Sequence, residues 1–181
     1  MEKPRIATAT LAGCFGCHMS ILDIDERILE LVKVVDFDKS PIDDIKTFSQ
    51  RCLVGLIEGG CSTEENVHVL KEFRKHCDIL ISVGACACTG GIPALRNHVT
   101  LEECLNEAYR NGPTVYNPDN VIPSDKEIPL CLDKVYPAHH VVKIDYFLPG
   151  CPPSGDTIWE GLTALLGGKP LAFPYELIKY D

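Results

Sequence analysis

Short apolar runs alternate along this chain with segments in which apolar residues recur at helical spacing. The apolar runs have the length and composition of buried strands, and most of them end close to a glycine. We predict five strands in this way, at residues 5–11, 32–37, 52–57, 78–83 and 141–147.

Helices are predicted between the strands. A helix over residues 21–31 follows the first strand, and the hydroxyl and acidic residues at 62–65 cap a second helix that contains Val67, Leu70 and Phe73. Further helical segments are predicted at residues 93–97, 100–110 and 154–166. Residues 111–131 contain four prolines and lack periodicity, so they form a long connecting loop or a surface that faces a partner.

The alternation of strands and helices determines the fold class. It predicts a flavodoxin-like α/β fold, in which helices cover both faces of a mostly parallel five-stranded sheet, as a single domain over residues 1–181. In such sheets, ligands bind outside the carboxyl ends of the strands.

Charge and composition exclude some classes of function for this chain. The chain has 17 basic and 26 acidic residues, a net charge of −9, and its basic residues are scattered, so nucleic-acid binding is excluded. No apolar run approaches the roughly 18 residues that span a membrane, and no secretory or twin-arginine signal is recognisable. We therefore expect a cytoplasmic protein, in which ten cysteines point to metal or redox chemistry rather than to disulfides.

Cysteines gather at the carboxyl edge of the predicted sheet. Cys14 and Cys17 follow the first strand, Cys86 follows the fourth and Cys151 follows the fifth. Four thiolates, of which two form a close Cys-x-x-Cys pair and the last precedes a proline, are typical ligands of an iron-sulfur cluster. The same edge also holds Cys61 and Cys88, so geometry alone leaves six candidates for four positions.

Other interpretations of these cysteines remain open at this point. Cys14 and Cys17 alone could form a thioredoxin-type dithiol, but that interpretation leaves Cys86 and Cys151 without a role. Structural zinc sites usually show two close pairs rather than one pair and two single cysteines. A flavin, FMN, is disfavoured because the loop at residues 10–16 lacks a hydroxyl-rich phosphate cradle.

The remaining candidates are less specific. Glu58 ends the third strand at the same edge, where it is either a proton relay or partner contact beside the cluster or a solvated carboxylate. His18 follows Cys17 and either donates to a cluster sulfur or is an ordinary surface or core histidine. The other four cysteines are predicted to be buried thiols or to have no role in the site: Cys52, Cys77, Cys104 and Cys131.

Three motifs carry a family resemblance. They are Gly-Cys-Phe-Gly-Cys-His-Met-Ser at 13–20, Gly-Ala-Cys-Ala-Cys-Thr-Gly-Gly at 84–91 and Pro-Gly-Cys-Pro-Pro at 149–153. Together they resemble the small subunit of NiFe hydrogenases, and the first is most similar to the cytoplasmic, bidirectional NAD-reducing enzymes. Subunits of respiratory complex I share the second and third motifs but carry two adjacent cysteines in the first.

The resemblance implies both a ligand set and partners. It implies that Cys14, Cys17, Cys86 and Cys151 bind the proximal 4Fe-4S cluster, with Cys88 at a variable position and Cys61 as a neighbour. Electrons would pass between a large subunit that holds the NiFe centre and an iron-sulfur and flavin diaphorase module that reduces NAD. The region that carries further clusters in larger small subunits is expected to be absent, because no cysteine follows Cys151. The alternatives are a complex-I-like relay in a quinone-reducing assembly and a dithiol oxidoreductase.

Overall fold

A parallel five-stranded sheet forms the centre of the molecule, which a computed structural model describes over residues 3–178. The strand order is β2-β1-β3-β5-β7, and every pair is parallel. This is the flavodoxin-like order, so the predicted fold class is confirmed. The strands are β1 (Arg5–Thr10), β2 (Asp36–Phe37), β3 (Cys52–Glu58), β5 (Cys77–Val83) and β7 (Tyr146–Leu148).

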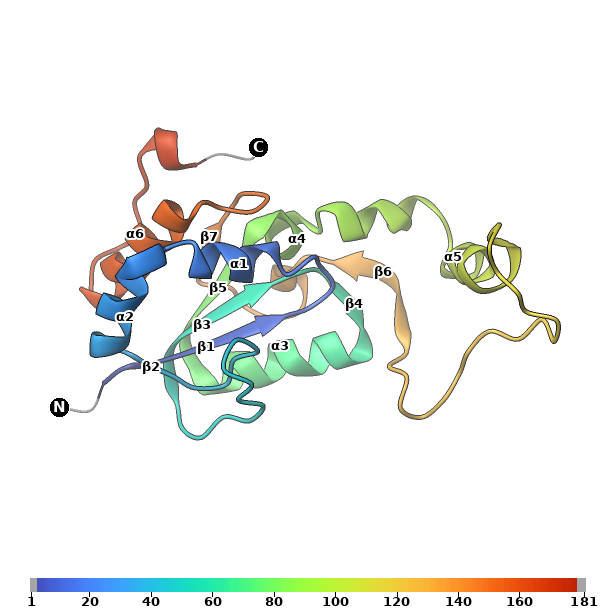
Figure 1. The fold of residues 1–181 in the computed structure, drawn as a ribbon, viewed down its shortest axis with the longest axis horizontal. Helices are drawn as coiled ribbons and strands as arrows, with labels where there is room; N and C mark the ends of the chain where they lie inside the picture. The colour runs from blue at the N-terminus through green and yellow to red at the C-terminus, as the bar shows by residue number, and fades with distance from the viewer. Residues whose placement is uncertain (1–2, 179–181) are drawn as a thin grey trace.

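Helices cover both faces of this sheet (Figure 1). On one face, helices α1 (Gly16–Leu22), α2 (Ile28–Val34) and α6 (Gly155–Leu166) contribute Ile21, Leu31 and Ile158 to a core with Val54 and Leu56. On the other face, α3 (Glu64–His76) contributes Leu70 and Phe73 to a second core. The central strands read as continuous apolar runs because both of their faces are buried.

The second strand is shorter than predicted. Residues 32–34 belong to α2, and only Asp36 and Phe37 pair with β1. The predicted helix over residues 21–31 is also divided, because Asp25 adopts a positive φ of 54° and begins the short 3-10 helix η1 (Asp25–Arg27) between α1 and α2. The prediction of a strand at Val32 was wrong because a run of β-branched residues there continues a helix whose buried contact is Leu31.

The fifth strand also begins later than predicted. Residues 141–145 are irregular, and they follow the 3-10 helix η4 (Ala138–His140) before β7 begins at Tyr146. Val141, Val142 and Ile144 pack against the second core without pairing to β5. An irregular segment that buries apolar side chains therefore has the same pattern of apolar residues as a strand.

A small second sheet extends the molecule beyond the main one. Strand β4 (Cys61–Thr63) pairs antiparallel with β6 (Cys131–Tyr136), and neither was predicted. Thr63 caps α3 by accepting a hydrogen bond from the backbone N–H of Asn66, which confirms the predicted capping position. Between these strands lie α4 (Gly84–Thr89), η2 (Ile92–His98), α5 (Leu101–Asn106) and the π-helical turn η3 (Glu107–Asn111), of which α5 and the loop after it extend away from the sheet (Figure 1). A last 3-10 turn is η5 (Tyr175–Leu177).

The helices of the described residues are short. None of them is long and apolar enough to cross a membrane.

A buried carboxylate fixes the loop that leads from β2 to β3. Asp38 is almost fully buried and accepts hydrogen bonds from the backbone N–H groups of Lys39 and Ser49, at 2.8 and 2.9 Å, and from the hydroxyl of Ser49 at 2.7 Å. Burial raises the pKa of Asp38, but these hydrogen bonds outweigh it and hold the pKa below its usual value.

We expect Asp38→Asn to destabilise the full chain by about 2 kcal/mol at pH 7, because it removes charge-assisted hydrogen bonds from a buried site. The lowered pKa means that the carboxylate contributes its full stability above pH ~4 and that this contribution is lost as pH falls through the folded-state pKa. Urea unfolding at pH 7 and pH 3 should therefore show the difference between the two proteins shrinking at the lower pH. Asp43→Asn, at an exposed position of the same loop, serves as the control, and an equal effect of both substitutions would contradict the prediction.

Candidate metal centre

The structure brings four cysteines together at the carboxyl edge of the sheet. Cys14 follows β1, Cys17 lies in the first turn of α1, Cys86 lies in α4 and Cys151 follows β7. All four are free thiols, with Cys14 and Cys151 exposed and the other two half-buried. The thiol of Cys17 lies near enough to those of Cys14 and Cys86 for their thiolate forms to repel one another, and the thiol of Cys86 is related in the same way to Cys14 and Cys151.

Backbone contacts hold the loops that carry these thiols against one another. The N–H of Ala85 donates to the carbonyl of Gly150 at 2.7 Å, which joins the Cys86 and Cys151 loops. Ala12 and Gly60 exchange two backbone hydrogen bonds, of 2.7 and 3.0 Å, which join the loop after β1 to the loop after β3. The thiols therefore rest on a connected backbone frame rather than on independent loops.

Glycines keep side chains away from the sulfurs. Gly84 has a φ of +81°, and a Cβ atom there would overlap Sγ of Cys17. A Cβ at Gly91 would lie 3.0 Å from Sγ of Cys86, and one at Gly16 would lie 3.1 Å from Sγ of Cys14. Four free thiols at one edge, three of them packed against glycines, match the Cys₄ ligand set of a 4Fe-4S cluster in number and kind.

A buried carboxylate lies directly behind the Cys17 loop. Glu58 is 3% exposed, and its Oε2 accepts a hydrogen bond from the backbone N–H of Cys17 at 3.0 Å. Its Oε1 lies 2.9 Å from Nδ1 of His18, which is itself 1% exposed and stacks on Phe15. The alternative of a solvated carboxylate at Glu58 is therefore wrong, and His18 is a core residue.

The polar contacts continue inward from His18. Its Nε2 lies 3.0 Å from Oγ1 of Thr8, and that hydroxyl lies 2.9 Å from Oγ of Ser40. Thr8 and Ser40 are buried as well. A chain of buried polar side chains thus leads from the Cys17 loop through β1 to the segment after β2, and sequence reasoning missed it because no motif links these positions.

The surroundings shift the pKa values of the site residues. Burial, followed by the negative charge of Glu58, raises the pKa of the Cys17 thiol. Burial, followed by the charge of Cys151, raises the pKa of Cys86. Burial also acts to raise the pKa of Glu58, but its interactions with the nearby side chains of His18 and Thr10 outweigh it and lower the pKa. Metal binding must displace the thiol protons, so affinity for iron is expected to rise with pH.

Two other cysteines at this edge, Cys88 and Cys61, lie apart from the four thiols of the site. Cys88 is 8% exposed, and its thiol lies within donating distance of the backbone carbonyls of Ser82 and Leu148, at 3.5 and 3.8 Å. Cys61 is fully buried in the second core. Burial raises the pKa of Cys88 to about 12 and that of Cys61 to about 11.

The remaining cysteines lie outside the site. Cys52 and Cys77 are fully buried on neighbouring strands, as predicted, where their Cα atoms are in register. Cys104 is half-buried and Cys131 is exposed. Among the described residues, no three His, Cys, Asp or Glu side chains are grouped closely enough for a single metal ion. That spacing has no bearing on a cluster whose ligands bind separate irons.

Comparison with protein families gives a clear match. The model of the NADH ubiquinone oxidoreductase 20 Kd subunit family matches residues 14–165, a segment that includes all four cysteines of the site. The chain belongs to this family.

Individual proteins are similar to nearly the whole of this chain. The chain is 50% identical to the NAD-reducing hydrogenase HoxS subunit delta of Cupriavidus necator, over 99% of its own length and 86% of that protein. It is 39% identical, over 96% of its own length, to a subunit of the F420-non-reducing hydrogenase of Methanothermobacter thermautotrophicus, of which it spans only 56%.

A solved structure of an NAD+-reducing [NiFe]-hydrogenase in the H2-reduced state contains a chain with the same fold. The TM-score is 0.95 at 49% identity, and the match covers 99% of this chain and all of that one. These comparisons confirm the resemblance to the small subunit of NAD-reducing NiFe hydrogenases.

We expect Gly84→Ala to abolish iron binding, because its Cβ would displace the thiol of Cys17. Gly168→Ala is the matched control: Gly168 also has a positive φ, of 67°, but nothing lies within 4 Å of a Cβ there. Both substitutions cost about 1–2 kcal/mol for a left-handed alanine, whereas only Gly84→Ala should lose iron. Iron content and urea unfolding measured on both proteins test this, and retention of full iron by Gly84→Ala would contradict it.

Proposed function

We propose that this chain is the electron-transfer small subunit of an NAD-reducing NiFe hydrogenase. One proximal 4Fe-4S cluster would be held by Cys14, Cys17, Cys86 and Cys151. The observation that carries the proposal is the convergence of these four free thiols from separate loops at one edge of the sheet. When bound, such a cluster supplies reversible one-electron transfer.

The residues of this chain hold the ligand set and set its environment. Glu58 accepts the hydrogen bond from the backbone N–H of Cys17 and so helps to hold the backbone that carries this thiol. Cys14 and Cys151 are exposed, which lets a partner approach the cluster from this edge. A role for Glu58 in relaying protons or in contacting a partner remains a prediction.

The partners follow from the same proposal. A large subunit would hold the NiFe centre where hydrogen is split or formed, and an iron-sulfur and flavin diaphorase module would reduce NAD. The relatives support this assignment because both are named as hydrogenase subunits, one of them NAD-reducing. We propose a cytoplasmic location for the assembly and a single cluster-binding domain over residues 1–181, whose outermost residues lie outside the described part.

A second candidate is an electron relay in a quinone-reducing assembly. The name of the family, which is that of a subunit of NADH ubiquinone oxidoreductase, favours it. Against it, Phe15 and Gly16 separate the two cysteines of the first motif, as in hydrogenases rather than in complex I.

A dithiol oxidoreductase is a weaker candidate. It would use only the pair Cys14 and Cys17. That leaves Cys86 and Cys151 without a role, although Cys86 interacts electrostatically with Cys14, Cys17 and Cys151.

We expect Cys86→Ser to lose the cluster and Cys88→Ser to retain it. The two thiols lie two residues apart on α4, but only that of Cys86 interacts with Cys14 and Cys151. Anaerobic iron and sulfide analysis should give about four of each per chain in the unaltered protein and in Cys88→Ser.

Activity of the purified complex provides the functional test. Hydrogen-dependent reduction of NAD should fall at least a hundredfold in Cys86→Ser and stay within about twofold of the unaltered complex in Cys88→Ser. Quinone reduction without any hydrogen-dependent activity in an intact, metal-replete complex would favour the second candidate instead. Absence of iron from the purified chain would favour the dithiol oxidoreductase instead.

A further inference from the structure

A long segment of this chain has no core of its own. Among residues 91–134, all of which the structure describes, no residue is buried. The segment begins at the end of α4, includes η2, α5 and η3, and returns through a loop to β6. Figure 1 shows α5 and the loop after it standing apart from the sheet and its helices. We call residues 91–134 the arm.

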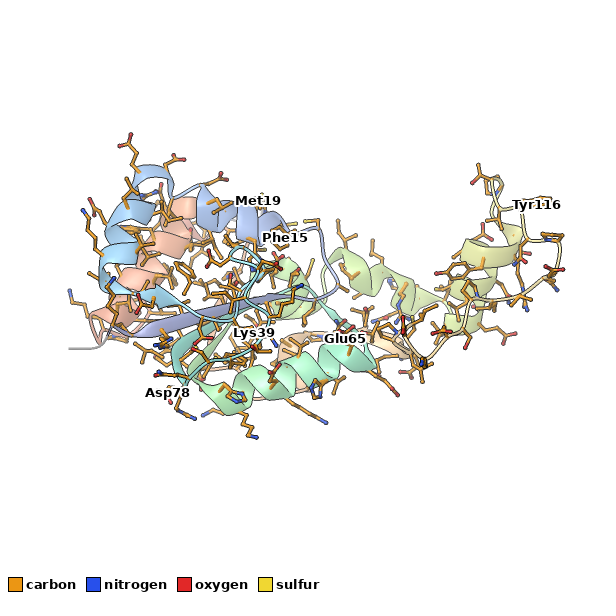
Figure 2. The ribbon with its side chains drawn as sticks, turned by 60° about the horizontal axis from the view of Figure 1, so that its bottom comes forward. Phe15, Met19, Lys39, Glu65, Asp78 and Tyr116 are labelled. Atoms are coloured by element: carbon orange, nitrogen blue, oxygen red, sulfur yellow. The ribbon has the colours of Figure 1, made fainter. Side chains whose placement is uncertain are left out.

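The arm exposes large apolar side chains. Tyr116 is 91% exposed and lies at the far end of the arm, well away from Phe15 and Met19 (Figure 2). The other large apolar side chains of the arm that are at least 42% exposed are Ile92, Leu95, Val99, Tyr109, Val121, Ile128 and Leu130. Apolar surface of this extent on a soluble chain marks an interaction site.

Part-buried hydrogen bonds join Arg96 and Asn97 of the arm to β6, but the far part of the arm is held by exposed ones. Asn117 donates to the carbonyls of Tyr109 and Val121, and Arg110 donates to the carbonyl of Asn120. Each such bond contributes little in water, because water competes for both groups. Without buried apolar surface, these bonds are too weak to offset the entropy of ordering the segment.

The charge of the arm points to the chemistry of its partner. Between residues 101 and 127 lie six exposed carboxylates, and in the described part of the chain none of them forms an ion pair: Glu102, Glu103, Glu107, Asp119, Asp125 and Glu127. Within the same range, only Arg110 and Lys126 oppose them. A complementary surface is apolar at its centre and basic at its rim.

The arm is continuous with the metal centre. A Cβ at Gly91, the first residue of the arm, would lie 3.0 Å from Sγ of Cys86, and the next residue, Ile92, is 71% exposed. The apolar surface therefore begins next to a proposed cluster ligand, and a protein seated on this end of the arm lies beside the site.

We propose that the arm is the docking element for a redox partner subunit that presents an apolar groove edged by lysine and arginine, and that the arm becomes stably ordered on that partner. This inference rests on the proposed function, because it takes the partner to be one that exchanges electrons with this chain. The arm thereby ties partner binding to the Cys86 side of the cluster.

The test uses the co-expressed complex, purified through a tag on this chain. One variant, Glu107→Lys with Glu127→Lys, reverses two exposed charges of the arm, and a second, Tyr116→Ser with Val121→Ser, removes apolar contacts. The matched controls are Glu26→Lys with Glu30→Lys and Leu29→Ser with Val34→Ser, at exposed positions in η1 and α2. The amounts of the large subunit and of the diaphorase subunits that copurify are measured, together with iron per chain.

Both arm variants should weaken the retention of one partner module about tenfold, as expected when anchoring contacts are lost, while iron per copy of this chain stays unchanged. The charge variant should also lose the salt dependence of that association. In the unaltered protein, protease should cut the isolated chain within residues 101–130 and spare it in the complex. Retention of both modules by both arm variants, or equal losses in the controls, would overturn the inference. Absence of iron from the unaltered complex would instead overturn the proposed function.

Discussion

The geometry of the metal centre depends on one buried carboxylate, that of Glu58. A carboxylate removed from water is costly unless hydrogen bonds replace its hydration. Here Glu58 receives one from the backbone N–H of Cys17, and its Oε1 lies 2.9 Å from Nδ1 of His18 without forming a hydrogen bond to it. Because Cys17 and His18 belong to α1 while Glu58 ends β3, the carboxylate ties these two elements together at the point where the Cys14–Cys17 loop leaves the sheet. The backbone that carries the Cys17 thiol is therefore held by a buried carboxylate.

Much of the fold could be predicted from the sequence, for an identifiable reason. Strands β1, β3 and β5 are buried on both faces, so their apolar runs are continuous and end at glycines. The errors fall at the sheet margins, where burial and strand pairing no longer coincide. Val32 is β-branched but continues helix α2, and Val141 is buried without pairing to a strand. Strand β6 pairs with β4 across a long sequence separation, which local periodicity does not report.

The candidate site, too, could be predicted only in part from the sequence. That Cys14, Cys86 and Cys151 lie at one edge could be predicted, because parallel strands bring their carboxyl ends together. The geometry that distinguishes Cys86 from Cys88 could not be predicted. Residues two positions apart on a helix point about 200° away from each other, and which of them faces the site depends on how α4 is oriented in the tertiary structure. The burial of Glu58 and the glycine contacts at Gly84 and Gly91 likewise exist only once the loops are assembled.

The electron relay proposed here would place two opposing requirements on its four cysteines. They would have to be held rigidly, and the sheet edge supplies a frame that joins Ala85 to Gly150 and Ala12 to Gly60. They must also lie near the surface, because electron transfer to another protein requires close approach, and Cys14 and Cys151 are exposed. Exposed apolar residues such as Ile92 lie next to the site, and no other described part of this chain covers that apolar surface. The lack of a core in residues 91–134 fits the proposed docking role, because the large apolar side chains there are exposed, where a second protein would bury them.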